Sequence, residues 1–168
     1  VYFAAYDALF DIARDPWGGS AFSAFGIWGP GRTAKVQCDL AALISPRMFN
    51  RFVVPALSRQ CDWLDNAMYH LDGTQAMVHL DALLGIDSLD AIEWTPQVSV
   101  EQGGHPRWYP LYRRILDAGK RVQVINVQPD EVFPLLDAIG TKGVFVMVNL
   151  DSEAEARALV EAVELRYG

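Results

Sequence analysis

The sequence predicts an α/β fold, a partial TIM-type (β/α) barrel of about five βα units with parallel strands. Strand-like and helix-like segments alternate along the chain, and several of the strands are apolar on both faces, as in parallel sheets covered by helices. A complete barrel needs about 250 residues, whereas this chain has 168. We therefore expect a single domain over residues 1–168 that forms only part of a barrel.

The first elements are the least regular. Residues 1–14 predict a helix, and FSAFGIW (residues 22–28) predicts a strand that stops at the following GPG. A second helix begins at ISP, because Ser45 can cap it and Pro46 suits its first position. Pro55 should kink this helix, since proline removes a backbone hydrogen bond and clashes with the preceding turn.

The later elements alternate regularly. Strands are expected at residues 67–72, 90–95, 121–127 and 143–150, and helices at 74–85, 107–119, 129–140 and from Ser152 to about Arg166. A doubly wound sheet usually carries a glycine-rich turn after its first strand, but GPGRT (residues 29–33) does not fit GxGxxG. No GxxxxGK[ST] motif occurs either, so the pattern favours part of a barrel.

Composition excludes several classes of partner. The net charge of −7 argues against nucleic acid, because phosphate binding needs a basic surface. No apolar run approaches the roughly 18 residues that span a bilayer, and VYFAAYDALF at the start lacks the basic region of a signal peptide. Cys38 and Cys61 do not make a disulfide framework. We expect a cytoplasmic protein with no nucleic-acid and no membrane partner.

Polar residues gather where the predicted strands end, which is where parallel α/β proteins place their functional groups. His70 and Asp72 point to the same face of their strand, because side chains alternate with period two. Glu93 has the equivalent position one strand later. The other candidates are Asp39 as a catalytic residue, and Trp28, Arg32, Gln37, Trp94 and Asn126 as residues that bind a small-molecule substrate.

His70, Asp72 and Glu93 are compatible with two chemistries. One nitrogen and two carboxylates can bind a divalent metal, or the three groups can transfer protons. Structural roles remain open as well, because His70 could bond a backbone carbonyl and Asp72 could cap the next helix. Glu93 is harder to explain in this way, since carboxylates inside apolar strands are rare unless paired. His79 is expected on a helix surface.

Three stretches together resemble the uroporphyrinogen decarboxylase superfamily, which includes zinc-dependent, corrinoid-linked methyltransferases. VQCDLAALISPRMFNRFVVPALSRQCDWL (residues 36–64) is similar to the family segment in which an acidic motif precedes "SP..F..F..P". MYHLDG (68–73) resembles the next strand, and GTKGVFVMVNLDSEAEARALVEAV (140–163) resembles the C-terminal strand and helix. The resemblance implies the C-terminal half of a barrel that is about twice as long in the family.

The resemblance also bears on cofactors. The methyltransferases hold zinc with a His-x-Cys pair and a later cysteine, and the metal activates a thiol. His70 stands at the histidine position, whereas Asp72 replaces the cysteine and Leu150 stands near the later one. The implied site is therefore a harder one of His70, Asp72 and Glu93, for zinc, manganese or cobalt; otherwise no cofactor is implied.

Three functions follow as expectations. The first is an enzyme of this superfamily, or a fragment of one, that acts on a small molecule in a methyltransferase-like reaction. The second is cofactor-free decarboxylation of a porphyrinogen-like or other carboxylate, a lyase reaction in which His70, Asp39 and Arg32 transfer protons and orient carboxylates. The third is an inactive half-barrel. Because half a barrel exposes strand edges and apolar surface, we expect a homodimer or association with the missing N-terminal half.

Overall fold

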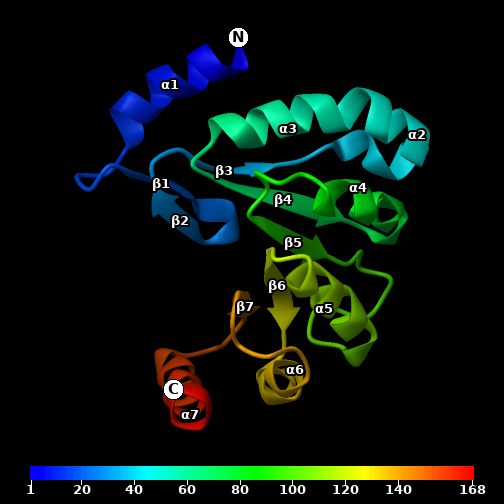
Figure 1. Cartoon of the computed structure of the whole chain (residues 1–168). Helices are drawn as coiled ribbons and strands as arrows, with labels where there is room; N and C mark the ends of the chain where they lie inside the picture. The colour runs from blue at the N-terminus through cyan, green and yellow to red at the C-terminus, as the bar shows by residue number, and fades with distance from the viewer. The chain divides into compact units, whose positions relative to one another are not determined.

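The computed structural model describes residues 1–168, whose helices and strands are labelled in Figure 1. The chain divides into two compact units. Unit 1 comprises Val1–His70 and Val78–Asp90, and unit 2 comprises Leu71–Met77 and Ala91–Gly168. Five parallel strands follow one another in the sheet order β3-β4-β5-β6-β7, and the sheet is not closed into a barrel. Spatial order thus equals chain order, as in consecutive βα units of a barrel, and the predicted parallel α/β fold is confirmed.

The element bounds agree with the sequence pattern over most of the chain. The helices are α1 (Tyr2–Ala13), α2 (Pro46–Met48), α3 (Val54–Trp63), α4 (Leu80–Leu84), α5 (Tyr109–Asp117), α6 (Val132–Ile139) and α7 (Glu153–Tyr167). The strands are β1 (Gly19–Phe22), β2 (Ile27–Pro30), β3 (Thr33–Val36), β4 (Asn66–Asp72), β5 (Ala91–Thr95), β6 (Arg121–Val127) and β7 (Val144–Val148). None of the helices combines the length and the apolar composition required to cross a bilayer.

The first strand of the sheet lies later than the sequence predicts. Residues 22–28 do not enter the sheet; they belong to an antiparallel hairpin in which Phe22 of β1 pairs with Ile27 of β2. The sheet begins with β3, whose Val36 pairs in parallel with Tyr69 of β4. The prediction for residues 22–28 is wrong because an apolar run of that length fits a hairpin arm as well as a buried strand.

Side chains from α1 and β1 cover the outer edge of β3. The backbone N–H of Thr33 donates to the Ser20 hydroxyl (2.9 Å), and the Tyr6 hydroxyl donates to the Thr33 carbonyl (3.0 Å). The Tyr6 ring in turn packs edge-on against Trp63 of α3, with ring centroids 5.0 Å apart. Both backbone groups that Thr33 turns away from β4 are therefore bonded.

The helix that starts at Ser45 begins as predicted, because the Ser45 hydroxyl accepts the N–H of Met48 (3.3 Å). We expected a kink at Pro55; the helix widens into a π turn at Phe49–Val53 and continues as α3 with Pro55 in its first turn. A single π turn inside an α-helix is the usual form of this rare conformation.

His79 is buried, and the prediction that it lies on a helix surface is wrong. Its Nε2–H donates to the carbonyl of Ala41 (2.8 Å), and its ring stacks on Phe49 at 4.1 Å and 11°. The segment Thr74–His79 is a 3₁₀ helix rather than an α-helix, which changes the face that each side chain occupies. His79 thus contacts both the loop after β3, through Ala41, and the π turn, through Phe49.

The strands of unit 2 separate an apolar face from a polar one. Trp94 of β5 is fully buried against Trp108, which directly precedes α5, with ring centroids 4.9 Å apart. Glu93 points to the opposite face, because neighbours along a strand alternate, and it pairs in register with Gln123 of β6. The polar pair therefore lies on the face of β5 and β6 opposite α5.

β7 ends the sheet and has no strand partner on its far side. Its Phe145 is 44% exposed, and an open apolar edge is a template for pairing with another chain. We expect light scattering at micromolar concentration to give a dimer, and Phe145→Lys to return the mass to the 18.7 kDa of the monomer, since lysine blocks edge pairing. Leu165→Lys, at an exposed position of α7, is the control. A wild-type monomer that persists on concentrating contradicts this prediction.

Candidate functional site

In unit 1, candidate residues lie at the carboxyl ends of β3 and β4. Lys35 pairs in register with Met68, so that Lys35, Gln37 and His70 belong to one face, and Val36 and Tyr69 are buried on the other. This arrangement follows from the period-two alternation of both strands. The structure therefore places predicted residues of β3 and β4 on a common side.

A chain of polar contacts runs along β3. The Lys35 ammonium donates to Gln37 Oε1, and Gln37 Nε2 donates to Asp39 Oδ1. The exposed Asp39 carboxylate is thereby linked, through Gln37, to a cation four residues earlier in the chain. The chain gives this strand end a positive and a negative group, both close to solvent.

Two phenylalanines position these polar groups. The Lys35 nitrogen lies 5.6 Å from the ring centroid of Phe22 and 5.2 Å from that of Phe25, within the range of cation–π attraction. Phe25 also contacts the His70 ring edge-on, with centroids 5.0 Å apart. Lys35 and His70 therefore share Phe25 as a neighbour.

Tyr69 lies beneath this cluster and is almost inaccessible. Burial, followed by the nearby charges of Cys38 and Asp39, raises the pKa of the Tyr69 phenol well above its ordinary value, and a hydrogen bond with the Cys38 backbone opposes part of the increase. The phenol is therefore protonated over the physiological pH range. It can donate a hydrogen bond but does not supply a negative charge.

Trp28 and Arg32 have structural contacts elsewhere in unit 1. The Trp28 indole N–H donates to Asp15 Oδ2 (2.6 Å), while the Arg32 guanidinium pairs with Asp7 (2.9 Å) and lies 4.8 Å from the Trp63 ring. These contacts join the hairpin and α1 to the rest of the unit. Substrate binding by either residue stays a prediction.

In unit 2 the central feature is a buried carboxyl group. Glu93 has no accessible surface, and its Oε1 accepts the Thr95 hydroxyl (2.6 Å). Gln123, its partner in register, is also buried, and its Nε2 donates to Met147 Sδ of β7 (3.0 Å). Carboxyl, hydroxyl and amide groups thus line the polar face of β5 and β6.

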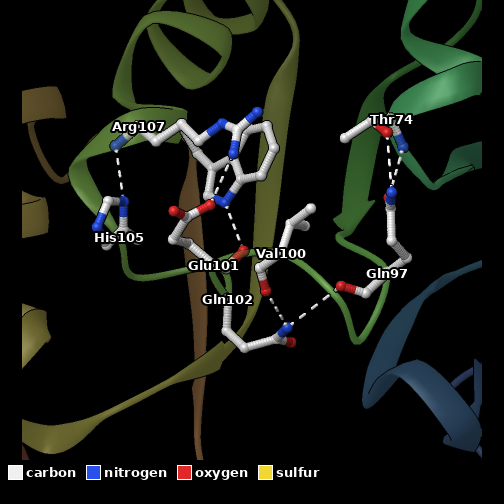
Figure 2. Close-up of polar contacts among 8 residues, drawn as sticks. Thr74, Gln97, Val100, Glu101, Gln102, His105 and Arg107 are labelled. Carbon is white, nitrogen blue, oxygen red and sulfur yellow. Dashed lines mark hydrogen bonds and ion pairs between the residues drawn. The ribbon is translucent and has the colours of Figure 1, made fainter.

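The loop after β5 is tied down by side-chain amides (Figure 2). Gln97 Oε1 accepts the N–H of Thr74 (2.9 Å), and Gln97 Nε2 donates to the Thr74 hydroxyl (3.0 Å). Gln102 Nε2 donates to the Val100 carbonyl (2.9 Å), as Figure 2 also shows. These bonds connect the turn that follows Asp72 to the loop at the end of β5. Asp72 itself is exposed.

Asn126 occupies a strained position at the end of β6. It is the only residue other than glycine with a positive φ, at 55°, and the register between β6 and β7 shifts between Val124 and Val127. Its Nδ2 donates to Gln102 Oε1 (3.2 Å). Strained backbone and strand irregularities cluster at functional sites, which is consistent with the predicted substrate-binding role.

Trp94 is a core residue in this structure. Full burial against Trp108 places it on the face of β5 opposite Glu93. The sequence grouped the two neighbours into one site, although alternation along the strand separates them. Substrate contact by Trp94 stays a prediction.

The predicted metal set is divided between the two units, since His70 belongs to unit 1 and Asp72 and Glu93 belong to unit 2. Convergence of these three side chains on one ion stays a prediction. Each unit by itself offers proton-transferring groups: an imidazole and a carboxylate in unit 1, and a buried carboxyl group in unit 2.

Several residues that shape these clusters were missed in the sequence. Gln123 carried the same signal as Glu93, a polar residue inside an apolar strand, and could have been found. Lys35 could be found only once β3 was recognised, because its face depends on the strand. Thr95 and Gln102 gave no signal, since polar residues near a strand end are common.

Comparisons with known proteins assign no family to this chain. The resemblance of three motifs to the uroporphyrinogen decarboxylase superfamily therefore remains a hypothesis. No protein-family model matches the sequence, and no curated protein is recognisably similar to it.

Proposed function

We propose that this chain is an enzyme, or part of one, of the uroporphyrinogen decarboxylase-like superfamily, and that it acts on a small molecule at the carboxyl ends of the parallel strands. The reaction that we place first is methyltransferase-like, with a divalent metal held by His70, Asp72 and Glu93. Glu93 is the observation that carries this proposal.

A carboxyl group with no accessible surface lowers the stability of the folded protein unless it is compensated. Removing it from water is unfavourable unless hydrogen bonds or a cation compensate, and an apolar side chain of similar volume often gives equal or greater stability. Thr95 supplies one hydrogen bond at 2.6 Å. A buried carboxyl group near a strand end, beside the buried amide of Gln123, is better explained by a chemical role than by packing.

The bound metal would supply Lewis-acid activation of a substrate group. His70 would offer its imidazole nitrogen, and Asp72 and Glu93 would offer carboxylate oxygens, a donor set that suits zinc, manganese or cobalt. Thr95 would orient the Glu93 carboxyl through its hydrogen bond.

The linked side chains of Lys35, Gln37 and Asp39 favour a second candidate function, cofactor-free decarboxylation. Lys35 provides a cation for a substrate carboxylate, and His70 and Asp39 provide groups for proton transfer on the same side of the strands. In this proposal Lys35 supplements Arg32, whose guanidinium is paired with Asp7. A catalytically inactive chain that self-associates is the third possibility.

Elemental analysis of the purified protein tests the metal. We expect stoichiometric zinc, manganese or cobalt in the wild type, and a decrease of metal content and of affinity by tenfold or more in His70→Ala, because one nitrogen ligand is lost. His105→Ala removes an exposed imidazole that caps residues 106–108, and is the matched control.

Three results are informative. Full metal retention in His70→Ala excludes His70 as a ligand. Absence of metal from the wild type, even after incubation with each ion, favours decarboxylation or the inactive chain. If Lys35→Met then abolishes carbon dioxide release from an active carboxylate substrate, the decarboxylase proposal is supported.

A further inference from the structure

A partly open cavity of about 370 Å³ lies in unit 2 between β7 and the helices α6 and α7. Valines and leucines from all three elements line it, and Val146 forms part of its floor. Val146 points to the opposite face of β7 from Met147, which contacts Gln123. The cavity is therefore distinct from the polar face that carries the proposed function.

The last turn of α7 holds this helix next to α6. Arg166 pairs with Asp137 (2.5 Å), and the Tyr167 hydroxyl donates to the same carboxylate (2.7 Å). No residue of α7 is buried, although Leu159 and Val163 face the cavity. The helix is thus anchored at its end, while its apolar side chains do not close the space above β7.

The size of the cavity suggests an occupant. The space is partly open to solvent, and an apolar molecule bound in it would remove valine and leucine side chains from water. Only Thr141 and Glu164 among the lining residues carry polar side chains, so water would find few hydrogen-bond partners. The volume falls within the range of roughly 300–1,000 Å³ that is typical of small-molecule pockets. An aliphatic chain fits this lining.

Charge determines which end group such a molecule would carry. Glu164 is exposed and belongs to the lining, and Glu153 and Glu161 lie on the same helix. The two arginines of α7 are already paired, Arg157 with Glu153 (2.7 Å) and Arg166 with the carboxylate of α6. We propose that the cavity binds the alkyl chain of a small amphiphile and that Glu164 pairs with its ammonium group.

Calorimetric titration with decylammonium, below its micelle concentration at pH 7, tests this site. We expect one saturable site with a negative heat-capacity change, because apolar surface is buried, and at least tenfold weaker binding of decanoate. Glu164→Lys should reverse this preference. Val146→Phe should weaken decylammonium binding by tenfold or more, because the larger ring occupies the floor of the cavity.

Leu165→Ala is the matched control, because this side chain is 92% exposed on the same helix and should leave binding unchanged. If circular dichroism shows that Val146→Phe does not fold, Val160→Trp narrows the cavity from the exposed side of α7 instead. Absence of saturable binding, or equal binding in the cavity-filling variants and the wild type, overturns the site. Equal affinity for decanoate and decylammonium overturns the role of Glu164.

Discussion

Gly103→Ala is expected to lower the free energy of unfolding by about 3 kcal/mol, at the upper end of the usual cost of overpacking. A Cβ atom at this position would lie 2.1 Å from the carbonyl oxygen of Ile125, which is backbone and cannot rotate away. The loop after β5 would have to withdraw from β6. Withdrawal would also strain the buried hydrogen bond from the Tyr112 hydroxyl to the Gly103 carbonyl (2.7 Å).

Gly85, the exposed glycine at the end of α4, provides the matched control. A Cβ atom at Gly85 would lie 3.5 Å from the nearest heavy atom, the carbonyl oxygen of Asp81, which is an ordinary van der Waals contact. Gly85→Ala should therefore change the free energy of unfolding by no more than about 0.5 kcal/mol. Urea unfolding monitored by tryptophan fluorescence measures both values. Equal costs would contradict the rigid approach of Gly103 to β6.

Stability is expected to fall steeply as the pH rises above about 10, the ordinary pKa of tyrosine. Burial raises the pKa of Tyr69 and of Tyr112 in the folded protein; the charges of Cys38 and Asp39 add to the effect at Tyr69, and that of Glu93 adds to it at Tyr112. In the unfolded chain these phenols lose their protons first, so higher pH favours unfolding. The stabilisation is complete below about pH 10 and is lost above it at about 1.4 kcal/mol per pH unit for each phenol.

Urea midpoints between pH 8 and pH 11 measure this dependence. Tyr112→Phe should remove about half of the slope that the two buried phenols cause, and Tyr69→Phe should remove the other half. Tyr2→Phe removes an exposed phenol and is the control. An unchanged slope in both buried variants would show that other groups control the alkaline transition.

The parallel α/β fold was predictable because long, regular segments carry the strongest signal. The strands VQVINV and VFVMV consist mainly of apolar, largely β-branched residues, and the helix between them, α6, ends at Gly140. Unit 1 was less predictable, because β3 has only four residues and Lys35 interrupts its apolar pattern. The cation is tolerated there because Phe22 and Phe25 pack around it, a tertiary contact that no local pattern reveals.

The candidate site was predictable only in part. The sequence grouped Gln37 with His70 because both follow predicted strands, and the structure places them at the carboxyl ends of the neighbouring strands β3 and β4. Alternation should have separated Glu93 from Trp94, since adjacent residues face opposite sides. The burial of His79 depends on a 3₁₀ helix where the sequence favours an α-helix, and on a carbonyl 38 positions earlier in the chain. Such long-range bonds are not encoded in local periodicity.

The covered edge of β3 has a consequence for assembly. Tyr6 and Ser20 occupy both backbone groups through which Thr33 could bind a further strand, so β7 is the edge that stays open for edge-to-edge pairing. A molecule with two open edges can add copies at both and grow into fibrils. With one open edge, pairing of β7 with its own copy about a two-fold axis leaves no edge for a third molecule.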